Sequence, residues 1–208
     1  MTSLSYPILS RGLYAAVWLL ALPLLCLLLL YRSLAQPAYR RHIAERIGVY
    51  SASVQRPIWL HAASLGEVQA ASALLNVLRR SYPAIPLLIS CQTPAGRQAA
   101  KALQLENCAV CYMPFDVGFL VRRFIRHFQP RIALVVETEI WPMLFLTLQQ
   151  QDIPLLIINA RMTERSLKRY LRFKVFRCAL ALPQHIACQS AADADRYLSA
   201  GANASAVS

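Results

Sequence analysis

Glycine is scarce in this chain, with six among 208 residues. Neither the G-x-G-x-x-G pattern of dinucleotide sites nor the G-x-x-x-x-G-K-[ST] pattern of P-loops occurs. Both patterns depend on glycines that let the backbone approach phosphate groups closely. The sequence therefore argues against a nucleotide-binding regulator that uses either motif.

Acidic residues are also few: 10 Asp and Glu stand against 22 Lys and Arg, which gives a net charge of +12. Such an excess suits nucleic acid, an anionic membrane surface or an acidic substrate. No RNA-binding aromatic motif, zinc finger or helix-turn-helix signature is present, so we expect no nucleic-acid partner. Among the remaining partners, the long apolar run near the N-terminus favours a membrane or a lipid.

Cysteine chemistry has little support among the six cysteines. The C-x-x-C formed by Cys108 and Cys111 lacks a second pair and lies in an apolar, strand-like run. Core packing explains it better than a metal or redox site, and we expect no metal. Ser–His–Asp and Cys–His nucleophiles also lack support, and His61 is predicted to be a packed residue at a strand end.

A long uncharged run occupies the N-terminal region, from Leu13 to Tyr31. It is long enough to cross a bilayer as a helix, with a kink at Pro23. A signal peptide is the alternative, but only Arg11 precedes the run and basic residues follow it at once. By the positive-inside rule, residues 1–31 are predicted to be an uncleaved single-pass anchor with the remaining chain in the cytoplasm.

Residues 32–56 form a polar, basic connector, and residues 57–208 alternate short apolar runs with helical patterns. Strict alternation of this kind predicts an α/β, Rossmann-like domain with a buried parallel sheet. The expected strands are Ile58–His61, Ile85–Cys91, Cys108–Met113, Ile132–Glu137, Pro154–Asn159 and His185–Gln189. The expected helices are Glu67–Ser81, Pro94–Leu103, Val117–Phe128, Pro142–Gln150, Thr163–Leu182 and Ala191–Ala200.

A small-residue turn follows the first expected strand and delivers Glu67 to the start of a helix. Ligands bind at this edge of open α/β sheets, so Glu67 is a candidate general base, with Ser64 and Gly66 beside the substrate. The alternative is a first-turn glutamate that complements the helix dipole. A helix N-terminus favours the ionised carboxylate, so burial would have to restore the basicity of Glu67.

A second acidic element, Glu137 with Glu139, lies at the end of another apolar run. If the strand continues, the two side chains share one face and raise each other's proton affinity. The alternative is a pair satisfied by backbone N–H groups and an arginine. Trp141 beside them could stack on a substrate ring or serve packing alone.

Two further turns lie on the expected ligand edge of the sheet. Asn159 and Arg161 follow the fifth strand, where the guanidinium could clamp a carboxylate or phosphate or form an ion pair with a nearby glutamate. Thr93 and Gly96 form a strand-to-helix turn that could offer donors to a ligand. We therefore expect these four residues to bind substrate.

Basic residues recur at three- and four-residue steps along the expected helix Thr163–Leu182. Such a face can lie against anionic head groups, although a solvated face of a soluble helix is slightly more common. The residues are Arg165, Lys168, Arg169, Arg172 and Arg177.

Several motifs, in order along the chain, resemble those of bacterial 3-deoxy-D-manno-octulosonic acid (Kdo) transferases, which are inverting glycosyltransferases of the GT-B fold. The resemblance covers essentially the whole chain. The motifs are Gln36–Arg41 with Glu45-Arg46, Leu60-His61, Ser64–Glu67, Thr93–Gly96, Pro114–Asp116, Glu137–Pro142 and Asn159–Met162.

This resemblance implies transfer of Kdo from CMP-Kdo to the lipid A precursor at the cytoplasmic face of the bacterial inner membrane. It implies Glu67 as the general base and Glu139, together with Glu137, as acidic groups of the acceptor side. It also implies binding roles for Arg161 and the Thr93–Gly96 turn. It implies no cofactor besides the sugar donor.

GT-B enzymes have two Rossmann-like domains, and the second mainly binds the CMP-sugar. We therefore expect this chain to be the N-terminal, acceptor-side half, and to be inactive alone. The alternative is a membrane-attached module that binds the lipid A precursor without catalysis.

Overall fold

The computed structural model describes residues 8–208, with side chains from residue 12 onward. Residues 1–7 of the predicted anchor and the side chain of Arg11 lie outside the described residues. A helix, α1 (Ile8–Ala35), contains the uncharged run. Within it, residues 12–35 are long and apolar enough to cross a membrane.

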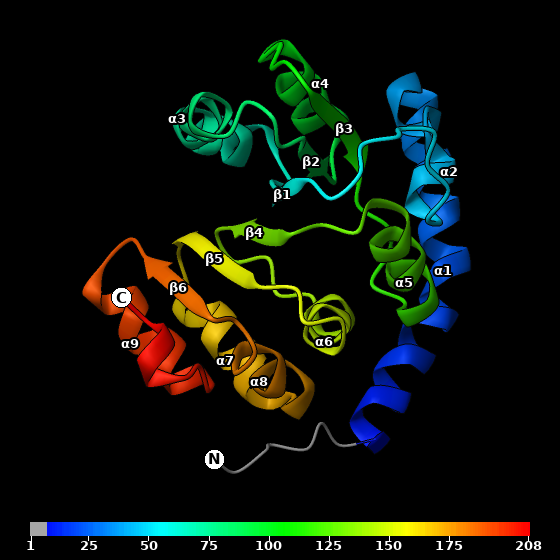
Figure 1. Ribbon diagram of the computed structural model, residues 1–208. Helices are drawn as coiled ribbons and strands as arrows, with labels where there is room; N and C mark the ends of the chain where they lie inside the picture. Colours follow the sequence, from blue (N-terminus) through cyan, green and yellow to red (C-terminus); the bar gives the residue numbers. More distant parts are fainter. Residues whose placement is uncertain (1–7) are drawn as a thin grey trace.

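A parallel sheet of six strands forms the centre of the molecule (Figure 1). The strand order is β3-β2-β1-β4-β5-β6, and every strand pairs in parallel with its neighbours. This confirms the predicted doubly wound, Rossmann-like sheet. The strands are β1 (Ile58–His61), β2 (Leu87–Cys91), β3 (Cys108–Tyr112), β4 (Ile132–Val136), β5 (Leu155–Ala160) and β6 (His185–Cys188).

Helices cover both faces of this sheet, as the strand pattern requires. Side chains alternate along β1, so Trp59 enters one apolar cluster while Ile58 and Leu60 enter the other. The second cluster lies under α3 (Leu65–Ser81) and α4 (Pro94–Ala102). The first lies under α5 (Gly118–Phe128), α6 (Pro142–Gln150), α7 (Glu164–Arg172), α8 (Lys174–Leu180) and α9 (Ala191–Ala200).

Local signals explain where these helices begin and end. The hydroxyls of Ser64 and Thr93 accept backbone N–H groups in the first turns of α3 and α4. Pro94 and Pro142 occupy first helical positions, and Gly201 ends α9 with φ +106°.

The helix predicted over Thr163–Leu182 is wrong as one element, because it breaks at Phe173, whose backbone is extended. The break separates two different faces. Tyr170 is the buried residue of α7, whereas α8 buries Val175 and Leu180 among others. The predicted basic face is therefore divided between two helices, and its basic side chains are exposed.

The segment predicted as a connector packs onto the domain. It contains a 3-10 turn (Pro37–Arg40) and α2 (Ile43–Arg46). Buried Glu45 accepts hydrogen bonds from Arg97 Nη1 at 2.7 Å and from the Tyr112 backbone N–H at 2.7 Å. Arg46, one of the arginines that follow the anchor, is buried over the Tyr112 ring, with its guanidinium carbon 4.2 Å from the ring centroid.

Candidate functional site

The centre of the sheet places two carboxylate-bearing turns next to each other. β1 lies between β2 and β4, and the chain winds away from β1 in opposite directions on the two sides. Such a reversal leaves a crevice outside the carboxyl ends of the strands, where α/β proteins bind ligands. Glu67 follows β1, and Glu137 with Glu139 follows β4.

Glu67 is held rigidly in the first turn of α3. Its Oε2 accepts the Ala63 backbone N–H at 2.7 Å, and its Oε1 accepts the Ser64 hydroxyl at 2.8 Å. The Ser64 Oγ in turn accepts the Glu67 N–H at 3.3 Å. This reciprocal arrangement resembles a capping box. Glu67 therefore also has the structural role that the sequence offered as the alternative, that of a first-turn glutamate at a helix N-terminus.

Burial nevertheless raises the pKa of Glu67 above its usual value, with a further upward contribution from Glu137. The hydrogen bonds from Ala63 and Ser64 act in the opposite direction without cancelling the burial. The requirement set by the sequence, that burial must offset the helix N-terminus, is therefore met. A fixed carboxylate with raised proton affinity suits a general base.

The predicted strand Ile132–Glu137 is wrong at its end, because β4 stops at Val136 and Glu137 has φ +59°. The expected common strand face of Glu137 and Glu139 is therefore wrong too. Two tyrosine hydroxyls, one from α7 and one from α9, donate hydrogen bonds to the backbone of this bend. Tyr197 donates to the Glu137 carbonyl at 3.2 Å, and Tyr170 donates to the Thr138 carbonyl at 3.3 Å.

The carboxylate of Glu139 accepts fewer hydrogen bonds than that of Glu67. The indole N–H of Trp141 donates to its Oε2 at 2.8 Å, while Oε1 has no hydrogen-bond partner within residues 8–208. Burial raises the pKa of Glu139 to about 7, and the charges of Glu67 and then Glu137 add to the rise. The bend therefore achieves the coupling of carboxylates that the sequence suggested, although by a different geometry.

Trp141 is half-buried, and its indole N–H holds Glu139. Its ring also stands edge-on to His61, with centroids 6.0 Å apart. His61 is fully buried, as predicted, and burial lowers its pKa to about 4. Its Nδ1 lies 2.8 Å from Ser90 Oγ, which also accepts the Trp59 indole N–H at 2.8 Å. We conclude that His61 is uncharged at neutral pH and that it packs against the site.

Asp116 is a buried carboxylate near the site whose role the sequence did not explain. Its carboxylate is fully buried and accepts the backbone N–H groups of Met143 at 3.0 Å and Leu144 at 2.8 Å, at the start of α6. The hydroxyl of Tyr14 in α1 donates to it at 2.7 Å. Burial raises the pKa of Asp116 to about 6. Asp116 therefore links α1 to the helix that follows Trp141.

Glu139 and Trp141 line a hollow of about 310 Å³ beside α1. Its walls come from α1, from the loop after β4 and from α7 and α8, and they combine aromatic rings with one carboxylate and one guanidinium. The lining residues are Tyr14, Trp18, Thr138, Glu139, Ile140, Trp141, Arg169, Tyr170 and Phe176.

Arg161 and Asn159 lie next to this loop at the end of β5. The Thr138 hydroxyl donates to the Arg161 carbonyl, and the Arg161 side chain is exposed without an ion pair in the part of the chain that the structure describes. Asn159 is exposed with φ +51°, and its carbonyl accepts from Gln189. Both side chains are available to a ligand.

Thr93, Gly96 and Gly66 differ in what surrounds them. The Thr93 hydroxyl caps α4 and donates to the Ala63 carbonyl at 3.2 Å. A Cβ on Gly96 would meet the backbone of Ala63 and Ser64 at 3.1 Å, so Gly96 lets α4 pack against the Glu67 turn. A Cβ on Gly66 would meet no atom within 4 Å, which leaves open space in front of that turn.

Within the described part of the chain, His, Cys, Asp and Glu side chains form no group of three that could hold a metal ion.

The family model and the curated relatives agree on one family. Residues 41–208 match the family model of 3-deoxy-D-manno-octulosonic-acid transferase (kdotransferase). The transferase of that name from Haemophilus influenzae is 38% identical over 79% of this chain and 39% of its own length. That of Bordetella pertussis is 32% identical over 74% of this chain and 37% of its own length. The chain thus spans about two fifths of the length of these relatives.

Two solved structures of UDP-N-acetylglucosamine 2-epimerases, one of them a putative enzyme from Listeria monocytogenes, share the fold. Their TM-scores are 0.54 and 0.53, at 12% and 11% identity, and each covers 74% of this chain. The matches cover 45% and 44% of those proteins, respectively. On the family model and the curated relatives, this chain belongs to the 3-deoxy-D-manno-octulosonic-acid transferase family.

Proposed function

We propose that this chain is the acceptor-side domain of a glycosyltransferase that moves Kdo from CMP-Kdo to the lipid A precursor in lipopolysaccharide synthesis. The observation that carries the proposal is the group of coupled carboxyls, Glu67, Glu137 and Glu139, at the switch point of the sheet. Membership of the Kdo transferase family supplies the reaction class.

In the proposed reaction, a hydroxyl oxygen of the acceptor attacks the anomeric carbon of Kdo as the bond from that carbon to CMP breaks. The configuration at this carbon inverts, and CMP leaves with the bonding electron pair. Glu67 takes the hydroxyl proton, because its carboxylate is fixed by Ala63 and Ser64 and burial raises its pKa.

Glu139 is the second acidic group in this proposal. Its pKa of about 7 leaves it partly protonated at neutral pH, so it accepts or donates a hydrogen bond at the acceptor. Glu137 acts mainly through its charge, which raises the proton affinity of both neighbours. Arg161 and Asn159 bind the anionic acceptor from the end of β5, and Ser64 and Gly66 border the reacting hydroxyl.

Thr93 and Gly96 serve this proposed site indirectly. Both contact the backbone of the turn that precedes Glu67. Their binding role is therefore to hold this turn at the distance the substrate requires.

The donor CMP-Kdo requires partners that we propose lie on a second domain, within the length of the relatives that this chain does not match. We propose no further cofactor. The acceptor is a lipid, so the enzyme would work at the cytoplasmic face of the bacterial inner membrane, attached through α1.

The test uses the full-length, two-domain protein with CMP-Kdo and lipid A precursor. Glu67→Gln keeps the size of the side chain and one oxygen that can accept the Ala63 N–H, and it removes the base. Glu106→Gln is the matched control, since Glu106 is exposed and precedes β3 at the opposite edge of the sheet. We expect transfer to be lost in the first variant and retained in the second.

Two outcomes would contradict the proposal. Full turnover by Glu67→Gln would remove Glu67 as the base. A wild-type protein that binds lipid A precursor without binding CMP-Kdo would instead be a non-catalytic lipid-binding module.

A further inference from the structure

Two opposite faces of α1 have different surroundings. One face is half-buried or buried against the rest of the chain, through Tyr14, Trp18, Leu22, Leu25, Leu29 and Ser33. We call the opposite face the outer stripe, and its side chains are between 56% and 81% exposed. The outer stripe consists of Leu13, Val17, Leu20, Leu24, Leu27, Tyr31 and Leu34.

The N-terminal end of α1 is attached to the sheet domain. The Tyr14 hydroxyl donates to the buried Asp116 carboxylate, and its ring meets Phe176 of α8 edge-on at 6.2 Å. One turn later, the Trp18 ring lies 6.1 Å from that of Phe115. Figure 1 shows α1 running alongside the domain rather than away from it.

The C-terminal end of α1 is attached to the same body. Ser33 is 5% exposed, and twelve residues later the chain reaches Glu45, which is fixed by Arg97. Along the helix axis, Tyr14 and Ser33 are separated by about 28 Å, close to the roughly 30 Å hydrocarbon thickness of a bilayer.

A helix that crossed the bilayer would place these two ends at opposite surfaces. Phe115, Asp116 and Phe176 contact the N-terminal end, so they would have to lie on the far side or within the hydrocarbon. These residues belong to the folded α/β domain, whose open loops and exposed arginines require water. The contacts at both ends of α1 are therefore incompatible with a domain that stays on one side.

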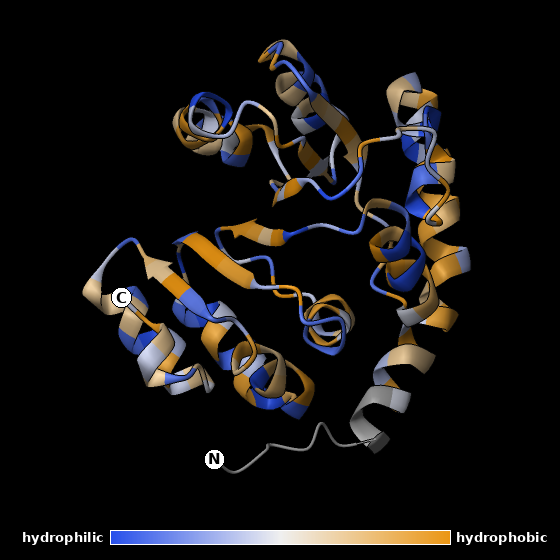
Figure 2. Ribbon diagram, in the orientation of Figure 1, coloured by the Kyte–Doolittle hydropathy of each residue, from blue (hydrophilic) through white to orange (hydrophobic). Residues whose placement is uncertain are grey.

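We propose that α1 lies in the plane of the membrane surface, with its outer stripe in an anionic phospholipid bilayer and its inner face forming part of the acceptor hollow. An apolar stripe of this length is suited to the boundary between head groups and acyl chains. Figure 2 shows mostly apolar colouring over the middle of α1.

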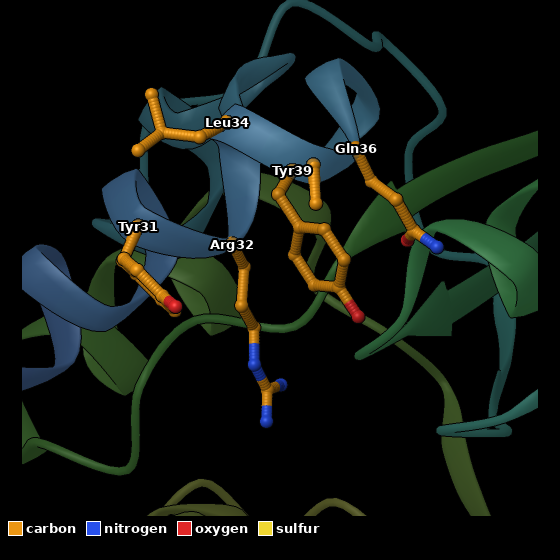
Figure 3. Close-up of a pocket in the computed structure, with 6 residues that line it drawn as sticks. Tyr31, Arg32, Leu34, Gln36 and Tyr39 are labelled. Atoms are coloured by element: carbon orange, nitrogen blue, oxygen red, sulfur yellow. The ribbon is translucent and has the colours of Figure 1, made fainter.

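Charge and aromatic residues at the end of α1 support a bilayer as the occupant. Arg32, Arg40 and Arg41 are exposed there, where they can pair with anionic head groups. Tyr31 and Tyr39 line a hollow of about 390 Å³ together with Arg32 (Figure 3). Tyrosines prefer this interfacial level of a membrane.

The second part of the proposal rests on the proposed function. Tyr14 and Trp18 of α1 line the same hollow as Glu139. With α1 in the membrane plane, this hollow opens at the bilayer surface. A lipid acceptor can then reach Glu139 along α1 while its acyl chains stay in the membrane.

Spin-label depth measurements test the orientation without any assay of activity. The full-length protein is reconstituted by detergent removal into vesicles of phosphatidylethanolamine and phosphatidylglycerol, so that either orientation can form. Single labels replace Leu13, Leu20, Leu27 or Leu34 as cysteine variants, each with Cys26→Ser. Cys26 is the exposed native cysteine, and the other five are buried or half-buried.

In-plane attachment predicts four similar, shallow depths, because these positions share one face of the helix. A crossing helix predicts a deep middle, with Leu13 and Leu34 about 31 Å apart along the axis and near opposite surfaces. A profile with that maximum would overturn the in-plane orientation and would leave the proposed transfer reaction untouched.

The acceptor wall is tested by Trp18→Ala, with Leu20→Ala on the outer stripe as the matched control. We expect Trp18→Ala to raise KM for the lipid acceptor several-fold with KM for CMP-Kdo unchanged. Leu20→Ala should weaken binding to vesicles and leave KM for a detergent-solubilised acceptor unchanged. An unchanged acceptor KM in Trp18→Ala would overturn the proposal that α1 forms part of the acceptor hollow, whatever the depth profile shows.

Discussion

The turns after β1 and β4 each carry a carboxylate to the same crevice, but they hold it in different ways. Glu67 is fixed by a backbone N–H and a serine hydroxyl in a regular helical turn. Glu139 follows an irregular bend and is held by one indole N–H. Its pKa reaches about 7, with the charge of Glu67 among the causes.

This difference shows how one crevice can hold two carboxyls with separate tasks. Donors to both oxygens favour the ionised form of Glu67, whereas burial with a single donor favours the protonated form of Glu139. At neutral pH the first is suited to take a proton and the second to share one.

The largest effect is expected from Glu67→Gln in the full-length enzyme. Loss of a general base lowers kcat by about 10²–10⁴-fold. Glu139→Gln should cost at least tenfold less, since Gln still accepts the Trp141 N–H. Initial rates with lipid acceptor measure both variants, and equal losses would show that the two carboxyls do not have separate tasks.

The pH dependence of stability gives the next largest effect. Because the pKa of Glu139 is about 7 when folded and 4.5 ordinarily, the unfolded chain binds fewer protons between these values. Stability contributed by the protonated form is therefore present below pH 4.5 and lost as the pH rises through 7. We expect Glu139→Gln to be more stable than the wild type at pH 8, by a free energy of the order of 2 kcal/mol.

Urea unfolding at pH 4.5 and pH 8 measures this difference. Asp116→Asn serves as a comparison, because Asp116 also has a raised pKa but accepts three hydrogen bonds. A Glu139→Gln gain that is equal at both pH values would contradict a titrating Glu139.

Ser64→Ala tests the rigid side of the comparison. It removes the helix cap and one donor to Glu67 but leaves the Ala63 N–H in place. Loss of such a cap destabilises a protein by about 1 kcal/mol. Thermal unfolding provides the measurement, and Ser72→Ala, at a half-buried serine within α3 that does not cap the helix, provides the control.

Trp141→Phe tests the looser side and should give the smallest effect. The indole N–H stabilises the charged form of Glu139, so its loss should raise the pKa of that carboxyl further above its usual value. Carboxyl titration by NMR would show this shift, while the pKa of Glu67 should move less. A fall in the pKa of Glu139 would mean that Trp141 acts mainly by excluding water.

The regular side of the comparison was predictable from the sequence. Short apolar runs between helical patterns predicted the six strands along the chain, and β1 and α6 match their predicted ranges. Ser64 three residues before Glu67 is a local signal, because capping depends on near neighbours.

The irregular side was not predictable, because distant residues decide it. Glu137 bends where Tyr170 and Tyr197 hold the backbone from other helices. The α7–α8 break contains neither proline nor glycine to announce it. Asp116 links α1 to α6 only once the fold brings these two helices together. In the same way, Glu45 links α2 to β3 only in the folded chain.

The buried pair of Glu45 and Arg97 also limits where the chain can be shortened to obtain a water-soluble form. Removal of α1 together with α2 would leave the Arg97 guanidinium buried without its carboxylate, which typically costs about 3–5 kcal/mol. A truncated form that begins at Gln36 would keep this pair and lose only the outer stripe and its inner contacts. Crystallisation or NMR of the isolated domain should therefore start from Gln36 rather than from the first strand.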